Sequence, residues 1–441
     1  MAEGGSAGIS PLDEAYGKRL DGDATGALRL ATAILESGAE HLGAAALGAR
    51  ILVDEKRTTL AAEVAMRLVD ATIRRGDLPA AVVAACIAAD AGEKKEPLVA
   101  RIAQAFARGS KRLADVPPAP PPLPAEPKTL GEIEKLDREA LVARAEAALQ
   151  KFLGEEDAVP DDAPLPALPL FSALGPKPLA RLLSMLTVTE TPRGGEAVKQ
   201  GEEGRAAYIV VRGFLQVIRH GETGDTVLAA LGPGAIFGEM ALVSDAPRAA
   251  SVVAVEPAQM LCIPRDELEA LARTEPAIGV ELGAFCHGRM LSNLLRTSDI
   301  MTRLELGERT SLIHRFVART FAAGDVVLRK GEEAAGLLLI ATGGVLVSSQ
   351  DSEGDRIVLA ELGPGDVVGE ISLVLRKPAS ADVVAEHPTV ALELKRDEFM
   401  DAIRRHPALL AELYELATKR EEETRSVVAQ EALDVDDIVL V

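Results

Sequence analysis

The chain contains no tryptophan, and aromatic residues make up only 3% of its 441 residues. Because hydrophobic residues still amount to 48%, its cores must be built from Leu, Val, Ile and Ala. Basic residues are also few: 48 Lys and Arg against 68 Asp and Glu give a formal net charge of −20. Such an acidic chain is a poor candidate for general binding to nucleic acid or to anionic membranes. Its length allows two to four domains.

Cysteine is scarce as well. The three cysteines, Cys86, Cys262 and Cys286, are scattered and odd in number, so they give neither a metal-ligand spacing nor a disulfide framework. A reducing cytoplasm is the simplest compartment for such a chain. The first residues lack the basic start and apolar core of a signal peptide, and no apolar run is long enough to span a bilayer.

The chain also lacks the motifs that carry common catalytic chemistry. We find no P-loop, no Gly-x-Ser-x-Gly and no His-Glu-x-x-His in the sequence. The six histidines are isolated, and each is expected to be a surface or satisfied histidine: His41, His220, His287, His314, His387 and His406. We therefore expect a protein that is not an enzyme and that has no metal site and no cofactor.

Residues 11–113 carry the pattern of a helical domain, after a start, residues 1–10, that we expect to be disordered. Gly-Asp precedes an alanine-rich segment twice, at residues 22–24 and 76–78. Apolar residues recur at steps of three and four. One such series is Leu28, Ala31, Ile34 and Leu35. The pattern resembles a short α-solenoid of tetratricopeptide-like repeats, although no clean repeat period occurs, and a plain helical bundle is the other interpretation. A solenoid would offer a groove for a peptide or another protein.

Residues 114–165 are predicted to form a linker. Prolines crowd residues 116–128 and make that part extended and stiff, which favours a spacer over a proline-rich ligand. One charged helix is expected at about residues 130–154.

Short β-like runs separated by glycine turns begin after residue 166, which is typical of a barrel or sandwich. The pattern extends over residues 166–298, and a helix is expected from about residue 265 to 297. The same order of features then repeats over residues 299–420. The offset is 130 at Gly201 and Gly331, so we expect two copies of one domain.

The most informative stretch lies in the first copy. Phe-Gly-Glu-Met-Ala-Leu at 237–242 is followed by Pro-Arg-Ala-Ala-Ser at 247–251. Gly238 lets the backbone approach a ligand, and Arg248, nine positions after Glu239, can fork onto phosphate oxygens. Glu239 is placed to accept a hydrogen bond from a sugar hydroxyl. The structural alternative is a turn before an apolar strand, with a surface arginine. The candidate ligand-binding residues are Phe237, Gly238, Glu239, Met240, Ala241, Arg248, Ala249, Ala250 and Ser251.

These residues resemble the phosphate-binding cassette of cyclic nucleotide-binding domains, the family of the catabolite activator proteins and of the regulatory subunits of cAMP-dependent protein kinase. The resemblance covers about residues 166–420 and implies two β jelly-roll barrels with flanking helices there. Together with the helical pattern of residues 11–113, this predicts an α+β multidomain protein, in which an N-terminal all-α, solenoid-like domain precedes the two barrels. The resemblance also implies that Arg248 binds the cyclic phosphate and that Glu239 binds the ribose 2′-hydroxyl.

The second cassette departs from this pattern, because Ala379 stands nine positions after Glu370. An anion enclosed without a cation carries an uncompensated desolvation cost, so we expect weak or absent nucleotide binding and a structural role for the second barrel. Rescue by Arg376 or Lys377 is the alternative, although both are expected on an exposed loop. The residues of this degenerate second site are Gly369, Glu370, Ile371, Ser372, Ala379 and Ser380.

The resemblance also bears on the choice of nucleotide. A threonine directly after the cassette arginine is associated with cGMP in the family, and this chain has Ala249 there, so cAMP is favoured. A cap on the base is expected from the helix after the barrel. Phe285 or Leu291 could supply it, although ordinary core positions are the preferred interpretation of both.

The segments outside the barrels suggest how the protein passes on a signal. The acidic tail, residues 421–441, is too short for a DNA-reading module, and the linker has no Arg-Arg-x-Ser/Ala inhibitor segment. We therefore expect a cytoplasmic cyclic nucleotide receptor that binds cAMP or cGMP in the first barrel and signals through a protein bound by its helical domain. A ligand-independent interaction scaffold and a transcription regulator that acts through a partner's DNA contacts are the alternatives. We expect no direct binding to nucleic acid or membranes.

Overall fold

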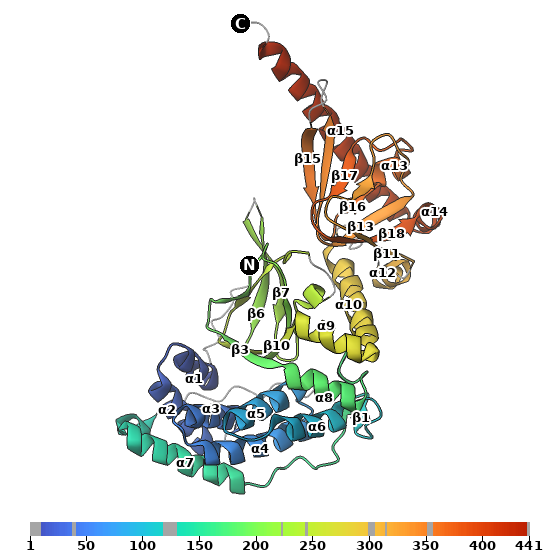
Figure 1. Cartoon of the computed structure of the whole chain (residues 1–441). Coiled ribbons are helices and arrows are strands. Elements are labelled where there is room, and N and C mark those ends of the chain that lie inside the picture. Colours follow the sequence, from blue (N-terminus) through green and yellow to red (C-terminus); the bar gives the residue numbers. More distant parts are fainter. Residues whose placement is uncertain are drawn as a thin grey trace. The chain divides into compact units, whose positions relative to one another are not determined.

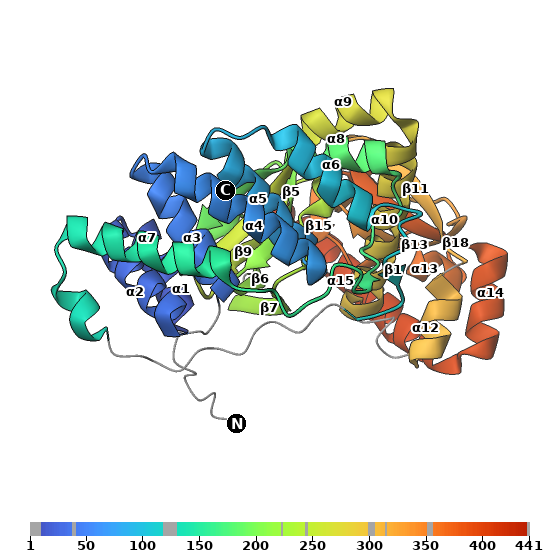
Figure 2. The same ribbon diagram turned by 90° about the horizontal axis from the view of Figure 1, so that it is seen from below.

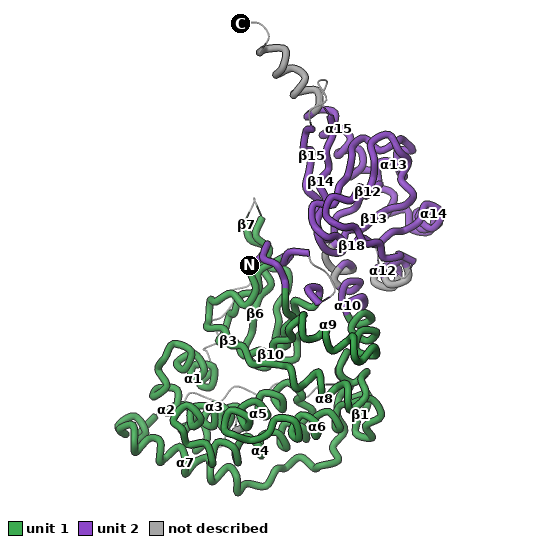
Figure 3. Tube along the Cα trace, viewed as in Figure 1, with its two compact units in different colours: residues 1–199, 205–239, 250–285 green, residues 200–204, 240–249, 286–441 purple. Residues whose placement is uncertain are grey.

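The computed structural model describes residues 10–37, 41–117, 130–221, 224–242, 246–298, 305–313, 315–350 and 356–438. Residues 1–9 of the predicted start (1–10) and residues 118–128 of the proline-rich segment (116–128) lie outside the described residues. The chain divides into two compact units (Figure 3). The first comprises Met1–Lys199, Arg205–Glu239 and Ala250–Phe285, and the second comprises Gln200–Gly204, Met240–Ala249 and Cys286–Val441.

The N-terminal region of the first unit is helical, as the sequence predicts. Its helices are α1 (Pro11–Leu20), α2 (Ala24–Ser37), α3 (His41–Asp54), α4 (Thr58–Arg74), α5 (Leu78–Asp90) and α6 (Lys95–Phe106). The repeated Gly-Asp pairs form the turns: Gly22 and Gly76 have positive φ angles, and the Asp77 carboxylate accepts a hydrogen bond from the Ala80 amide to cap α5. Consecutive helices pack on one another, while the solenoid interpretation stays a prediction.

The helix that the sequence places in the linker belongs to this helical layer. After a short 3-10 helix, η1 (Gly131–Lys135), α7 (Arg138–Gly154) packs across α2, α3 and α4 (Figure 2). Its buried side includes Leu141 and Leu149, and Arg144 forms a bidentate ion pair with Glu36 of α2. The predicted charged helix therefore has a buried packing face, and α7 is more than a spacer.

The first barrel follows α8 (Pro176–Met185) and consists of two four-stranded antiparallel sheets (Figure 1). One sheet has the order β3 (Thr187–Thr191), β10 (Ala258–Pro264), β5 (Ala206–Arg212) and β8 (Ile236–Phe237). The other has the order β4 (Glu196–Val198), β9 (Ser251–Ala254), β6 (Leu215–Gly221) and β7 (Gly224–Leu231). Aliphatic side chains such as Val210, Leu215 and Met260 fill the space between the sheets, as the low aromatic content requires.

Helix α1 docks on this barrel through a polar network. Arg19 forms an ion pair with Glu190 of β3 at 2.7 Å, and the side chain of Gln259 donates to the same carboxylate at 3.0 Å. Arg212 of β5 pairs with Asp13 at 2.8 Å and lies over the ring of Tyr16. The helical region and the first barrel are therefore joined by half-buried ion pairs within one unit.

The second barrel, in the second unit, repeats the strand order of the first. One sheet has the order β11 (Val317–Phe321), β18 (Thr389–Lys395), β13 (Gly336–Thr342) and β16 (Val367–Val368). The other has the order β12 (Val326–Leu328), β17 (Asp382–Ala385), β14 (Val345–Gln350) and β15 (Arg356–Leu362). Helices α12 (Leu306–Ile313), α13 (Glu370–Val374) and α14 (Arg396–Arg405) flank it. The prediction of two β domains with flanking helices is confirmed.

Two predicted segments differ in the structure. The helix expected from 265 to 297 is two helices, α9 (Arg265–Thr274) and α10 (Pro276–Thr297), because Pro276 cannot continue a preceding helix. The second domain, expected to end at residue 420, closes with a helix that continues into the acidic tail, α15 (Pro407–Ile438). This long helix is anchored by Leu409 and Leu413 in the core of the second unit, and Ala417, one turn further on, is also buried.

Candidate functional site

The first half of the first cassette lies directly after strand β8. The ring of Phe237 stacks on Tyr208 of β5, with 5.2 Å between ring centroids, and the two residues are register partners. Gly238 then adopts a φ of 69°, which favours glycine, and the chain enters the short 3-10 helix η2 (Glu239–Leu242). Glu239 is only 4% exposed. A buried carboxylate is therefore held at the end of a well-anchored strand.

Arg248 lies in the second half of the cassette, within the stretch Met240–Ala249 that belongs to the other compact unit. The Arg248 amide donates to the Glu202 carbonyl, and the Arg248 carbonyl accepts from the Gly201 amide, both at 2.9 Å. A Cβ atom built at Gly204 would lie 3.0 Å from Nε and Cζ of Arg248. The guanidinium therefore passes beside Gly204, where the missing side chain leaves it room.

The remaining candidate residues of the first cassette differ in exposure. Ala241 and Ser251 are buried, Ala250 is half-buried and Ala249 is exposed. Met240 packs against a hydrophobic cluster of the second unit that includes Leu291 of α10, so Leu291 is a core residue there. Arg248, Met240 and Ala241 lie in one compact unit and Glu239 in the other.

Ala379 of the second barrel occupies the backbone position of Arg248. The Ala379 amide donates to the Glu332 carbonyl and the Ala379 carbonyl accepts from the Gly331 amide, both at 2.8 Å, which repeats the pattern of the first copy. Ala334 stands at the position of Gly204, with the same offset of 130. The second copy therefore lacks both the guanidinium and the space beside it.

Glu370, the counterpart of Glu239, has an internal partner. Gly369 adopts a φ of 90°, and Glu370 begins α13 with only 3% of its surface exposed. Arg420 of α15 donates from Nη1 to Oε1 of Glu370 at 2.9 Å and to the carbonyl of Val367 at 2.7 Å. The carboxylate of the degenerate cassette is thus paired with a cation from the C-terminal helix.

A cavity of about 120 Å³ lies beside this ion pair. Residues of the cassette line it, including Glu370, Ser372 and Ala379, together with apolar strand residues. One side is formed by α15, through Arg420, Glu423, Thr424 and Val427. The C-terminal helix therefore closes the pocket of the second barrel.

Both barrels match the family model described as the cyclic nucleotide-binding domain, over residues 189–275 and 318–406. Each matched range contains one of the two cassettes and its barrel strands. The chain contains two cyclic nucleotide-binding domains in tandem. The resemblance of the two barrels to this family is therefore confirmed.

Relatives of this protein include regulatory subunits of protein kinase A. The chain is 28% identical over 230 residues to the cAMP-dependent protein kinase regulatory subunit of Yarrowia lipolytica, a match over 52% of this chain and 57% of that relative. Among solved structures, the regulatory domain of Toxoplasma gondii PKA with cAMP is 23% identical over 57% of this chain and 92% of its own, with a TM-score of 0.29. The Thermus thermophilus catabolite activator protein is 31% identical over 35% of this chain and 75% of its own, with a TM-score of 0.28.

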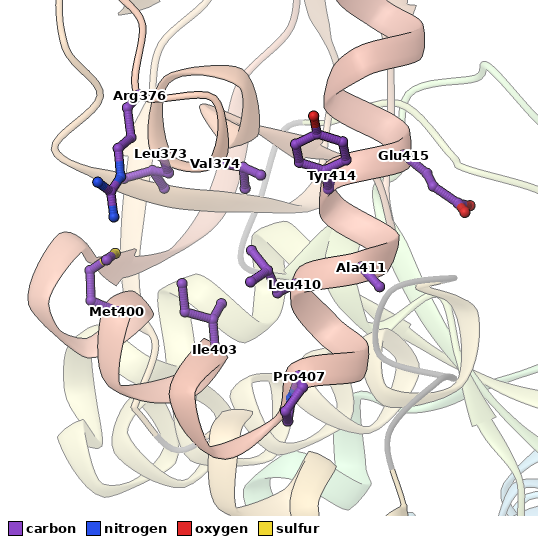
Figure 4. Close-up of a pocket in the computed structure, with 10 residues that line it drawn as sticks. All are labelled: Leu373, Val374, Arg376, Met400, Ile403, Pro407, Leu410, Ala411, Tyr414 and Glu415. Carbon is purple, nitrogen blue, oxygen red and sulfur yellow. The ribbon is translucent and has the colours of Figure 1, made fainter.

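The two basic residues considered as replacements for the missing arginine lie outside the cavity of the second nucleotide-binding domain. Lys377 donates from Nζ to Glu421 at 2.8 Å, on the surface. Arg376 lines a different groove of about 510 Å³, formed by α13, α14 and α15, together with Tyr414 (Figure 4). Neither side chain is among the residues that line the cavity. The second domain therefore has no substitute cation from this loop.

Within the described residues, no group of three or more His, Cys, Asp and Glu is arranged to hold a metal ion. In the same part of the chain, no helix combines the length and hydrophobicity needed to cross a membrane.

The sequence did not point to Arg420 as a pocket residue. It lies 50 positions after Glu370 (420 − 370), and no sequence motif links the two residues. The recurring apolar residues Leu409, Leu413 and Ala417 could have signalled that the helix continues toward it.

Proposed function

We propose that this protein is a cyclic AMP receptor that binds the nucleotide in its first domain and signals through protein contacts. The observation that carries the proposal is the complete first cassette, with buried Glu239 after Gly238 and Arg248 beside Gly204. The second cassette lacks the arginine, so one intact site is expected for each chain.

Arg248 is the cation proposed for the cyclic phosphate. A guanidinium can form two parallel hydrogen bonds with phosphate oxygens, and it stays charged at every physiological pH. The backbone bonds to Gly201 and Glu202 fix where its side chain starts. Hydrogen bonds to charged groups contribute about 1.5–3 kcal/mol, so losing them should weaken binding about ten- to hundredfold.

Glu239 is the residue proposed for the ribose 2′-hydroxyl. An ionised carboxylate only accepts hydrogen bonds, so a sugar hydroxyl is a suitable donor and a phosphate is not. Exposed Ala249 follows Arg248 and offers no side-chain hydroxyl to a guanine amino group. This supports a preference for cAMP over cGMP.

Met240 offers a route for the signal. It follows Glu239 in the chain, and its side chain packs against the cluster that includes Met290 and Leu291 of α10 and core residues of the second domain. A ligand that orders the cassette would change the packing of Met240 on this cluster. The free energy available for this change cannot exceed the difference between the ligand's binding free energies for the two packing arrangements of Met240, with and without ligand. We propose that the change reaches a protein partner bound by the N-terminal helices.

A ligand-independent interaction scaffold is the second candidate. One observation favours it: the second domain satisfies its own cassette glutamate through Arg420. The glutamate expected to accept from a ribose hydroxyl thus has an internal partner, so this domain needs no nucleotide to satisfy it.

Capture of partners separates the two candidates. The full chain would be immobilised and exposed to extract from its source cells with cAMP, with cGMP or with no nucleotide. A receptor should gain or lose a partner with cAMP, and Arg248→Ala should remove that response. A partner that binds equally under all three conditions, together with no heat of binding for cAMP, would favour the scaffold.

A further inference from the structure

The groove between α13, α14 and α15 is larger and more open than the cavity of the second cassette. Its volume is about 510 Å³, and it shares no lining residue with that cavity. Figure 4 shows Leu410 and Tyr414 of α15 on one side of the groove and Arg376 and Met400 on the other. Most of the lining is apolar, yet Leu410 and Tyr414 are 37% and 55% exposed. An open apolar groove between helices is suited to receive one face of another helix.

The apolar walls of this groove are specific to the second domain. Helices α14 and α15 correspond to α9 and α10 at an offset of 131, which aligns Pro407 with Pro276 (407 − 276). The first copy has one acid and two glycines where the second copy has large apolar side chains: Glu269, Gly279 and Gly283 stand in place of Met400, Leu410 and Tyr414. A Cβ atom at Gly283 would meet nothing within 4 Å, so space does not forbid a side chain there. The two copies therefore differ in this surface as well as in their cassettes.

Arg376 gives the groove a positive charge. Its side chain is exposed and forms no ion pair within the part of the chain that the structure describes. Its φ of 53° lies in the left-handed region, which is strained for a residue with a side chain. Glu415 is the other charged residue of the lining, and it points away from Arg376 on the outer side of α15 (Figure 4). The groove therefore favours an occupant that is both apolar and acidic.

The C-terminal part of α15 has this character. Apolar residues recur there at steps of four and three, the spacing of one helix face, at Val428, Ala432 and Val435. Residues 428–438 also contain four acids and no basic residue: the acids are Glu431, Asp434, Asp436 and Asp437. Because a helix rises 1.5 Å per residue, Ala432 lies about 27 Å along α15 from Tyr414. This segment therefore cannot reach the groove of its own chain.

We propose that residues 428–438 of α15 bind in the α13–α14–α15 groove of a second copy of the chain. A two-fold axis makes the contact reciprocal, so the two α15 helices run antiparallel and each groove receives one segment. The apolar face covers Leu410 and Tyr414, and the acids lie near Arg376. The turns between the two contacts carry Arg420, so pairing also holds α15 against Glu370. This inference goes beyond the function proposed for the first domain and does not depend on it.

Sedimentation equilibrium of the full chain tests the proposal, and we expect a reversible equilibrium between monomer and dimer. Tyr414→Asp in the groove and Val435→Asp in the segment should each lower the association constant at least about tenfold, because each places an unpaired charge against an apolar surface. Val280→Asp is the matched control. Val280 is 70% exposed and occupies the position of α10 that corresponds to Ala411, so this variant should associate as the unmodified chain does.

Mixing the two variants separates the proposed contact from a folding defect. A mixed dimer regains one intact pair, because the Tyr414→Asp chain still supplies its segment and the Val435→Asp chain still supplies its groove. The mixture should therefore associate more strongly than either variant alone. Three results would overturn the inference: a chain that stays monomeric at every concentration, a dimer that neither variant weakens, or a mixture that associates no more strongly than its components. None of them bears on cAMP binding by the first domain.

Discussion

Gly204 and Arg248 lie against each other in the first domain, where a Cβ atom at Gly204 would come within 3.0 Å of the guanidinium. The second domain has alanine at both equivalent positions, Ala334 and Ala379. The two differences belong together, because the glycine gives space to a side chain that the second copy has lost. The cation and its space therefore define which domain is suited to a cyclic phosphate.

Gly204→Ala should lower the affinity for cAMP about tenfold. The new methyl group would lie 2.6 Å from the Cβ atom of Ala241 and 3.0 Å from Nε and Cζ of Arg248. It would therefore displace both cassette residues while leaving the charge of Arg248 in place, so part of the bidentate contact is lost. Calorimetric titration with cAMP measures the change. Gly154→Ala is the matched control, because a Cβ atom at Gly154 meets no atom within 4 Å. The Gly154→Ala variant should bind cAMP with the affinity of the unmodified chain. Full affinity in Gly204→Ala would contradict the assigned position of Arg248.

The double variant Ala379→Arg with Ala334→Gly should give the second domain an affinity for cAMP. It restores the cation and the room beside it, in a domain whose backbone already matches the first. In an Arg248→Ala background, cAMP binding should rise at least about tenfold over the background alone. Ala379→Arg alone should gain less, because Ala334 stays in the way. Equal gains for the single and double variants would show that Ala334 does not restrict the site.

The duplicated domains and both cassettes could be predicted from the sequence, because glycine turns and short strands repeat at a nearly constant offset. The difference between Arg248 and Ala379 was visible for the same reason. The pairing of Gly204 with Arg248 was not, because the two residues are 44 positions apart (248 − 204) and only the fold brings them together.

Long-range contacts account for the other differences. Arg420 of α15 contacts Glu370. The local apolar pattern could predict that this helix continues, but it could not predict that the helix packs beside the second cassette. The docking of α1 on the barrel joins Arg19 to Glu190 across 171 positions, which no motif describes. The helix break at Pro276, by contrast, follows from a local rule that the sequence already contained.

Arg19→Ala should destabilise the first unit by about 1–3 kcal/mol. The ion pair with Glu190 is 16% and 19% exposed at its two side chains, and its loss leaves Glu190 with Gln259 as a neutral partner. Urea unfolding measures the free-energy change. Lys18→Ala is the control: its pair with Asp23 is 38% and 50% exposed, so its loss should cost less than about 0.5 kcal/mol. Equal effects of the two variants would show that the docking contact adds no stability.

Tyr16 should make the first unit sensitive to alkaline pH. Burial raises the pKa of its hydroxyl to about 12, against an opposing effect of the nearby Arg212 guanidinium. Because the folded pKa lies above the unfolded value of about 10, the stabilisation is complete below pH 10 and is lost as the pH rises through 12. Two pKa units correspond to about 3 kcal/mol. Unfolding at about pH 9.5 and 11.5 should show this loss in the unmodified chain.

The same pH comparison supplies its own controls. Tyr16→Phe should show a smaller fall in stability between the two pH values, because it has no hydroxyl to ionise. Tyr414→Phe, at a side chain that is 55% exposed, should behave as the unmodified chain does. If the stability of Tyr16→Phe falls between the two pH values by as much as that of the unmodified chain, Tyr16 is ruled out as the titrating group.

The central claim is that one complete cassette makes this protein a receptor for cAMP. Calorimetric titration of the full chain with cAMP, in parallel with Arg248→Ala and the exposed control Arg404→Ala, tests it most directly. We predict one cAMP bound for each unmodified chain, the same for Arg404→Ala, and about ten- to hundredfold weaker binding for Arg248→Ala. No heat with cAMP, or equal affinity in Arg248→Ala, would contradict the claim.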